Sequence, residues 1–317
     1  MIENLHRKIL FSIFAGTLIL AILTIYADLN NLLIALKNFK WILLVPILLL
    51  SLLNYFVRFL RWEFYLRKLN IKIPALKSFL IFISGLTMSI TPAKFGEALK
   101  SYLLKLTDNI QISRSAPIVV AERLTDFIAL VILAIYGSFY FNYGREIVAT
   151  VGLVLVGSVL LISKREFFYS ILNQMKKFTG ERIFGKIHIA YDSIVELVNV
   201  KILIPSVLIS TLSWFFECIG FYIVVNFYSY GFSLDLATFI YSFSTIAGAV
   251  SMLPGGLGIT EGSMTGLLIL NKIQKDNAVA ITIIIRFATL WFAVGLGIFA
   301  LYIFQKMMHK FKNDGQS

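Results

Sequence analysis

Residues 253–262 read Leu-Pro-Gly-Gly-Leu-Gly-Ile-Thr-Glu-Gly and lie inside an apolar stretch that runs from Leu236 to Leu270. Proline removes a helical hydrogen bond and glycine favours turns, so we expect the stretch to break near its middle. Each half is then too short to cross a hydrocarbon core of about 30 Å. Irregular backbone at membrane depth needs hydrogen bonds from protein or cavity water, which makes a re-entrant helical hairpin the expected structure.

A second apolar stretch, Ser78–Leu104, is interrupted in a similar way at Thr91-Pro92. After each break come a glycine, a glutamate and, in the next apolar run, an arginine. These are Gly96, Glu97 and Arg123 in the first case, and Gly258, Glu261 and Arg286 in the second. The matching order and similar spacing predict two diverged copies of one unit.

The composition places most of the chain in lipid. Of its 317 residues, 58% are hydrophobic and 15% are charged, whereas soluble domains have about one quarter charged residues. Six further runs are long enough to cross a membrane: Ile9–Tyr26, Trp41–Leu60, Ala116–Tyr136, Ile147–Ser163, Ile202–Asn226 and Ala278–Phe304. The sequence predicts an all-α polytopic membrane protein with about six spanning helices plus two re-entrant helical hairpins.

The net charge of +12 is distributed over short loops, which argues against nucleic-acid binding. One side of the predicted spans carries Arg7, Lys8, Arg61, Arg67, Lys68, Lys72, Lys77, Lys164, Arg165, Lys176, Lys177, Arg182, Lys186, Lys201, Lys306, Lys310 and Lys312. The other side carries Lys37, Lys40, Arg145, Lys272 and Lys275. The positive-inside rule therefore places both termini in the cytoplasm.

In this topology the two hairpins enter from opposite sides, as in the inverted repeats of secondary transporters. We expect a single transmembrane domain over residues 1–317, with a first repeat unit at about 41–136 and a second at about 202–304. Between the units, residues 164–201 form a connector whose apolar side chains recur at helical spacing. Two interpretations remain open for it: an amphipathic helix on the membrane surface, or a helix packed on the ends of the bundle.

Charged side chains at membrane depth are the candidate functional residues. They are Arg58, Lys94, Glu97, Lys100, Glu122, Arg123, Asp126, Glu217, Glu261 and Arg286. Such residues normally face a polar interior and pair with one another. We predict contacts between Glu97 and Arg123, and between Glu261 and Arg286. Either role remains open for these pairs: bridges that hold the hairpins in place, or substrate contacts.

The breaks themselves suggest an anion site. A helix that begins after Pro92 or after Gly255-Gly256 directs free N–H groups into the membrane. Lys94 follows Pro92 directly and is predicted to bind a phosphate. Gly255, Gly256 and Gly258 either make the turn or let a headgroup approach the backbone. We expect the two breaks to face one another across a polar cavity.

Signals for catalysis are absent or weak in the sequence. The histidines are His6, His188 and His309, outside the apolar runs, and Cys218 is the single cysteine. No phosphate-binding loop of the Gly-x-x-x-x-Gly-Lys-Ser/Thr type occurs. We therefore expect no catalytic residue, metal or cofactor.

The stretches 91–98, 122–126 and 253–262, followed by Arg286, resemble the flippase-like transmembrane domain of the lysylphosphatidylglycerol synthase/flippase family over nearly the whole chain. The resemblance implies translocation of a phospholipid or lipid-linked headgroup across the cytoplasmic membrane, and a possible homodimer. Full synthases continue into a soluble domain, whereas this sequence ends at Ser317. A separate lipid-modifying enzyme is thus the expected partner.

The predicted substrate-binding residues are Lys94, Glu97, Lys100, Glu122, Arg123, Asp126, Gly255, Gly256, Gly258, Glu261 and Arg286. Two other functions remain open at this stage. One is an accessory subunit or enzyme of lipid-linked glycan synthesis, and the other is a small-solute secondary transporter.

Overall fold

The computed structural model describes residues 27–91, 97–138, 181–314 and a few residues between 146 and 157. Within these ranges the chain is helical and contains no strand. Four of the predicted spans fall in the described part. The predicted span Ile9–Tyr26, and all but a few residues of Ile147–Ser163, lie outside it.

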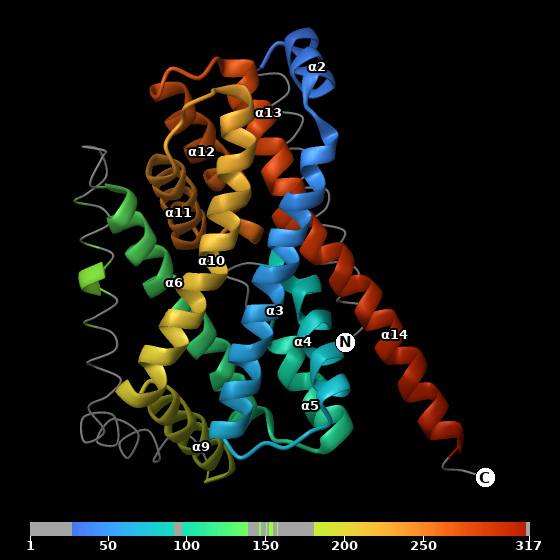
Figure 1. The fold of residues 1–317 in the computed structure, drawn as a ribbon. Helices are drawn as coiled ribbons and strands as arrows, with labels where there is room; N and C mark the ends of the chain where they lie inside the picture. Colours follow the sequence, from blue (N-terminus) through green and yellow to red (C-terminus); the bar gives the residue numbers. More distant parts are fainter. Residues whose placement is uncertain are drawn as a thin grey trace.

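Long apolar helices form the body of the molecule (Figure 1). In the described part of the chain, three are long and apolar enough to cross a membrane: Trp41–Lys68, Val200–Tyr228 and Lys275–Met308. They correspond to η1 (Trp41–Leu43) with α3 (Leu44–Lys68), to α10 (Val200–Tyr228), and to α13 (Lys275–Arg286), η5 (Phe287–Trp291) and α14 (Phe292–Asp314). The protein is therefore an all-α polytopic membrane protein, as predicted.

A fourth long helix, α6 (Ile112–Ser138), has 27 residues. At 1.5 Å per residue this is about 40 Å, which is long enough to cross a bilayer. Three charged residues, Glu122, Arg123 and Asp126, interrupt its apolar sequence near the middle. These charges face the interior of the bundle, where Glu122 and Asp126 are buried.

Helix α3 shows why the bundle suits a membrane. Its exposed face carries Leu49, Leu53, Phe56 and Leu60, which recur at helical spacing. The opposite face buries polar residues, among them Arg61. Apolar side chains thus point outward and polar side chains inward, the reverse of a soluble helix.

Two helical hairpins lie among the long helices. The first comprises α4 (Ala75–Leu86), η2 (Thr87–Ile90) and α5 (Leu99–Asp108). The second comprises α11 (Leu234–Val250), η4 (Pro254–Gly256) and α12 (Ile259–Leu270). The helices α4, α5, α11 and α12 have 12, 10, 17 and 12 residues, fewer than the roughly 20 that a span requires. The predicted breaks are confirmed, although Pro92 itself lies outside the described residues.

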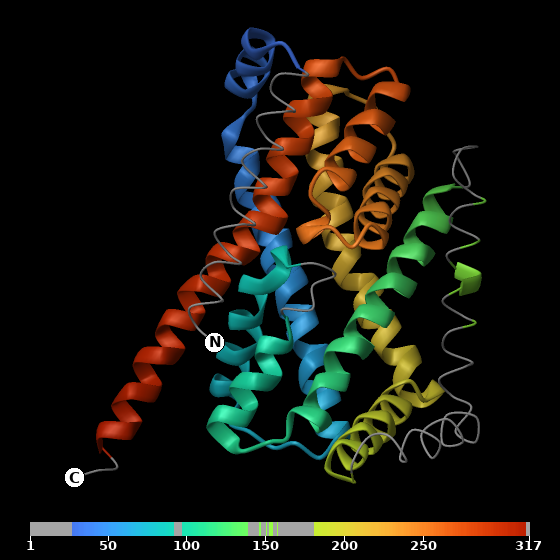
Figure 2. The ribbon, with the colours of Figure 1, turned by 180° about the vertical axis from the view of Figure 1, so that it is seen from behind.

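The hairpins occupy opposite halves of the molecule. In Figures 1 and 2, α4 and α5 lie in the half that contains α9, whereas α11 and α12 lie in the half that contains α2. Helix α4 packs against α14, the long helix after the second hairpin. Helix α11 packs against α6, the long helix after the first hairpin. Each hairpin is thus held by the last helix of the other unit, while α3 and α10, the first helices of the two units, pack against each other.

The tips of the hairpins meet near the middle of the molecule. Turn η2 contacts η4, and Ile90 forms a small buried apolar cluster with Leu257, Leu290 and Val294. We call these four residues the tip cluster. The prediction that the breaks face one another across a polar cavity is therefore wrong for the described residues. The residue that ends the first half-hairpin is a fully buried isoleucine, which packs directly on the opposing tip.

Two shorter helices lie at the ends of the bundle. Helix α9 (Glu181–Leu197) packs against α6 and buries Tyr191, Val195 and Leu197. These contacts favour the second interpretation of the connector, a helix packed on the bundle. At the opposite end lies α2 (Leu29–Asn38), whose first N–H groups are capped by the Asp28 side chain. The sequence did not predict this helix.

Candidate functional site

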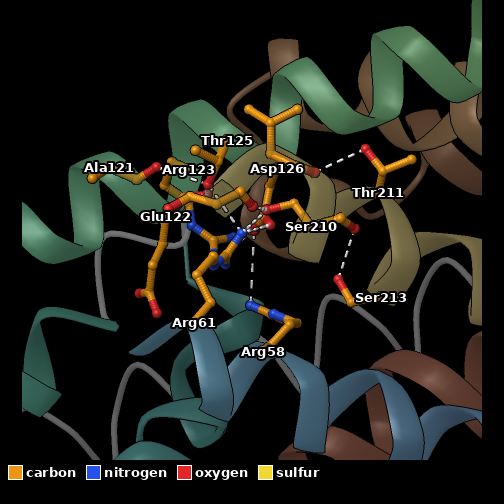
Figure 3. A network of polar contacts seen from close by, with 12 residues as sticks. Arg58, Arg61, Ala121, Glu122, Arg123, Thr125, Asp126, Ser210, Thr211 and Ser213 are labelled. Carbon is orange, nitrogen blue, oxygen red and sulfur yellow. Dashed lines mark hydrogen bonds and ion pairs between the residues drawn. The ribbon is translucent and has the colours of Figure 1, made fainter. Parts of the chain in front are cut away.

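Seven charged side chains from three helices meet inside the bundle, beside the first hairpin. We call this group the charge cluster. It consists of Arg58 and Arg61 on α3, Glu97 just before α5, Lys100 on α5, and Glu122, Arg123 and Asp126 on α6. Figure 3 shows part of this network. All but Arg123 are buried by residue exposure, and the side chain of Arg123 is only 17% exposed.

Asp126 is the centre of the charge cluster. Its Oδ1 atom lies 2.6 Å from Nη1 of Arg61, and its Oδ2 atom lies 2.9 Å from Nη2 of Arg123. Nη1 of Arg61 also donates to Thr125 Oγ1 at 3.0 Å and to Ser210 Oγ on α10. Arg61 thus joins α3, α6 and α10. Because one buried guanidinium bonds to groups on two other helices, this junction constrains the packing of the three helices.

Lys100 links the first hairpin to the cluster. Its Nζ atom donates to Glu122 Oε2 at 2.5 Å and lies 3.8 Å from Glu97 Oε2. The ammonium also lies 4.7 Å from the centre of the Trp62 ring, within the range of a cation–π contact. The aliphatic part of the side chain runs across Gly85 of α4. Lys100 therefore ties both halves of the hairpin to α6.

Gly85→Ala is expected to displace Lys100. A methyl group at this position would lie 2.6 Å from Cγ of Lys100, which is close to the backbone end of that side chain. Such overpacking typically costs about 1–3 kcal/mol. A lower unfolding midpoint in detergent is the expected measurement. Gly262→Ala on α12, where no atom lies within 4 Å of the new methyl group, should not lower the midpoint, because alanine is the better helix former; an equal lowering by both substitutions would contradict the assignment.

Both predicted glutamate–arginine contacts are confirmed. Nη2 of Arg123 donates to Glu97 Oε2 at 3.1 Å. Nε of Arg286 donates to Glu261 Oε1 at 2.6 Å. In each unit, a glutamate near the start of the second half-hairpin is held by an arginine on the following long helix. Whether these residues also bind substrate stays a prediction.

Two side chains bond to the backbone near the start of α12. The N–H of Gly258 donates to Glu261 Oε2 at 2.6 Å, so the glutamate caps its own helix. Nη2 of Arg286 donates to the Gly255 carbonyl at 2.8 Å. One N–H group at this helix start is therefore bonded to a carboxylate of the chain itself, and binding of an external anion there stays a prediction.

Gly255, Gly256 and Gly258 make the turn of the second hairpin. Their φ angles are 60°, 66° and 88°, in the left-handed region that side chains other than glycine rarely adopt. A methyl group on Gly256 would also lie 2.6 Å from Thr260 Oγ1. The turn explains these glycines, and their predicted contact with substrate remains untested.

Helices α3 and α10 pack against each other, and each carries a series of buried polar residues. Helix α3 buries Ser51, Asn54, Arg58 and Arg61, and helix α10 buries Ser206, Ser210, Ser213 and Glu217. Direct contacts join the two series, since Asn54 Nδ2 donates to the Ser213 carbonyl at 2.7 Å and Arg61 donates to Ser210. Glu217 accepts a hydrogen bond from Tyr241 of α11 at 2.5 Å. We call this interface the polar seam.

Arg61 and Ser210 were missed as site residues. The position of Arg61 just after the run Trp41–Leu60 predicts a basic residue that flanks a span, whereas α3 continues to Lys68 and the side chain of Arg61 is fully buried. A usable signal was present: positions 51, 54, 58 and 61, and positions 206, 210, 213 and 217, are polar at steps of three and four. Lys94 and Pro92 lie outside the described residues, so the predicted phosphate contact of Lys94 stays a prediction.

A π-helical turn at Phe287–Trp291 joins α13 to α14 next to the hairpin tips. Its carbonyls receive hydrogen bonds from α3, with Ser51 Oγ 2.9 Å from Ala288 O and Tyr55 Oη 2.7 Å from Thr289 O. Such turns interrupt the regular pattern of helical hydrogen bonds and occur often at functional sites. The two hydroxyl groups stabilise the irregular turn against α3.

Tyr55→Phe is expected to lower the free energy of unfolding by about 1–3 kcal/mol, since a buried carbonyl loses its donor. Unfolding of the purified protein in detergent, followed by intrinsic fluorescence, measures this change. Tyr302→Phe is the matched control because Tyr302 is 64% exposed. Equal stability of the two variants would show that the turn does not depend on Tyr55.

The fold and the charge cluster together define a polytopic membrane protein with a polar interior. A family model described as "Lysylphosphatidylglycerol synthase TM region" matches residues 13–297. The chain therefore belongs to this family, in agreement with the resemblance seen in its motifs.

Several archaeal proteins are similar to the chain. A UPF0104 membrane protein of Methanothermobacter thermautotrophicus is 25% identical over 287 residues, covering 79% of this chain and 83% of the relative. One from Pyrococcus horikoshii is 26% identical and covers 80% and 85%. Another from Methanocaldococcus jannaschii is 25% identical and covers 70% and 95%. All three are named as membrane proteins, with no activity in the name.

Proposed function

We propose that this protein translocates the headgroup of a phospholipid or lipid-linked compound from one leaflet of the cytoplasmic membrane to the other. The charge cluster carries the proposal: seven ionisable side chains are gathered among lipid-facing helices, beside a hairpin tip. Charges at this depth are costly and commonly mark a substrate pathway. The description of the family refers to lysylphosphatidylglycerol, which is a phospholipid, and this supports a lipid as the substrate class.

The arrangement of contacts supports an inverted repeat. The two units can be matched helix by helix in chain order: the first contains α3, α4, α5 and α6, and the second contains α10, α11, α12 and α13–α14. In this match the packing of α4 on α14 corresponds to the packing of α11 on α6. The two glutamate–arginine pairs also correspond under this exchange. Inverted repeats commonly open alternately to the two sides of the membrane around a site near its midplane. We propose that the two hairpins are re-entrant and play this part.

The tip cluster acts as the closed gate in this proposal. Ile90 contacts the opposing tip at Gly255, where a methyl group would lie 3.4 Å from the Ile90 Cα atom. Leu257, Leu290 and Val294 complete the apolar contact. A headgroup moving along the polar seam would pass this point only when the tips separate. The acyl chains would remain in lipid beside the exposed apolar faces.

We propose that both termini are cytoplasmic, because the basic residues concentrate on the corresponding side of the spans. Helix α9 and the base of the first hairpin then lie at the cytoplasmic end. The substrate would come from a separate lipid-modifying enzyme. Transport rather than catalysis is proposed, and a homodimer is compatible with this role.

Translocation is tested in proteoliposomes. Lipids that share one fluorescent acyl chain but differ in headgroup are placed in one leaflet, and extraction by albumin measures their exchange. The purified protein should accelerate exchange of at least one headgroup class at least tenfold over protein-free vesicles. Exchange at the protein-free rate for phospholipids, aminoacyl phospholipids and lipid-linked sugars would reject the function. Uptake of small solutes by the same vesicles would favour a secondary transporter instead.

A further inference from the structure

Arg58 differs from the other cations of the charge cluster. It is 5% exposed, yet its guanidinium makes no hydrogen bond to any described residue. Its two ion pairs, to Glu97 Oε1 and to Asp126 Oδ2, both measure 3.9 Å. A charge-assisted hydrogen bond measures about 2.7–2.9 Å, so neither contact is one. In Figure 3, Arg58 and Arg61 both extend from α3 toward Asp126, but only Arg61 reaches it closely.

The other three cations of the charge cluster already form a close ion pair with each of its three carboxylates. Arg61 contacts Asp126, Lys100 contacts Glu122, and Arg123 contacts both Glu97 and Asp126. Counted by residue type, the cluster as defined holds four basic and three acidic side chains, an excess of one formal positive charge. Arg58 is the cation of the cluster that makes no close contact with these carboxylates, and its removal would leave each of them with a close partner.

Unused donors accompany this charge. Nε of Arg58, Nε and Nη2 of Arg61, and Nε of Arg123 are buried without a hydrogen-bond acceptor in the described part of the chain. Buried polar groups are normally satisfied, and each exception needs an explanation. Arginine suits phosphate because its planar fork binds two oxygen atoms at once. A phosphodiester offers two free oxygens and one negative charge, which matches both the donors and the residual charge.

We propose that Arg58 binds the phosphodiester of the transported headgroup, which makes singly charged phospholipids the preferred substrate class. This inference rests on the proposed function, because it assigns a part of the substrate to that site. Arg61, Lys100 and Arg123 hold the cluster together, whereas Arg58 meets the substrate. The same chemistry would recognise free inorganic phosphate, so the test separates the two sources.

The test measures binding without transport. Purified protein in detergent is titrated separately with phosphatidylglycerol, with diacylglycerol of the same acyl chains, and with inorganic phosphate, and complexes are counted by native mass spectrometry. The variants are Arg58→Gln, Arg58→Lys and the control Arg67→Gln, which changes an exposed arginine on the same helix. Unfolding midpoints are measured without added lipid.

We expect wild-type protein to prefer phosphatidylglycerol to diacylglycerol. Losing a charged hydrogen-bonding partner should weaken phosphatidylglycerol binding roughly 10–100-fold in Arg58→Gln. Arg58→Lys should retain part of the affinity, since it keeps the charge but loses the fork. The control should bind as wild type. The unfolding midpoint of Arg58→Gln should equal or exceed that of wild type, because the change removes a buried charge that has no close partner.

Unchanged phosphatidylglycerol binding in Arg58→Gln, or a loss of stability as large as that of Arg61→Gln, would overturn the proposal. Arg58-dependent binding of inorganic phosphate without any binding of phosphatidylglycerol would also overturn it, in favour of a free anion. Failure of the proposed function gives a different result: Arg58-dependent lipid binding in a protein that moves no lipid in vesicles. In that case the binding site stands and translocation does not.

Discussion

Arg61→Gln is expected to lower the free energy of unfolding by about 3–5 kcal/mol, the usual cost of removing one partner from a buried ion pair. Arg61 is 0% exposed and lies 2.6 Å from Asp126. The substitution would also remove the donor to Thr125 and Ser210, and with it the junction of α3, α6 and α10. We expect little folded protein after extraction in mild detergent.

Size-exclusion profiles and unfolding midpoints in detergent measure this effect. Arg67→Gln is the matched control, since Arg67 is exposed in the same helix. The comparison with Arg58→Gln is more informative, because the two arginines lie one turn apart and both are buried. Similar midpoints for Arg61→Gln and wild-type protein would show that the charge cluster does not hold the helices together.

Arg286→Met is expected to have a similarly large effect, again about 3–5 kcal/mol. The side chain of Arg286 holds two parts of the second hairpin, the Glu261 carboxylate and the Gly255 carbonyl. Without it, a buried carboxylate has lost its close cation, and the turn at Gly255 has lost its donor. The second hairpin should then detach from α13.

The double variant Glu261→Gln/Arg286→Met tests the cause. Glutamine can still accept from the Gly258 N–H as a capping residue, but it carries no charge. If the buried charge is the main penalty, the double variant should be more stable than Arg286→Met alone. Lys275→Gln, at an exposed position of α13, serves as control. A double variant no better than the single one would assign the effect to the Gly255 carbonyl instead.

The sequence predicted the hairpins and the two glutamate–arginine contacts because strong local signals mark them. Proline and clustered glycines interrupt helices wherever they occur in an apolar run. An acid is followed about 25 residues later by an arginine twice at similar offsets, and ionisable residues are rare in membrane segments. Both signals depend on residue type and order alone, so no tertiary information was required.

Other features depend on how distant helices pack. Ser210 carries no charge and becomes important only because α10 lies against Arg61 of α3. The tips touch because apolar Ile90 meets a glycine turn more than 160 residues away in the sequence. The π-helical turn at Phe287–Trp291 has no proline or glycine to mark it, and its stabilising hydroxyl groups belong to α3. The residue pattern of one segment does not predict its contacts with another segment that is distant in the sequence.

A disulfide bond between the hairpin tips tests whether the tips must separate during translocation. In a Cys218→Ser background, which removes the single natural cysteine, Ile90→Cys and Leu257→Cys place two thiols within the tip cluster. The double variant is reconstituted and lipid exchange is followed by albumin extraction before oxidation, after oxidation and after reduction. We expect that oxidation stops exchange, that reduction restores it, and that neither single-cysteine variant responds. Exchange at an unchanged rate in fully cross-linked protein would show that the tips need not separate for transport.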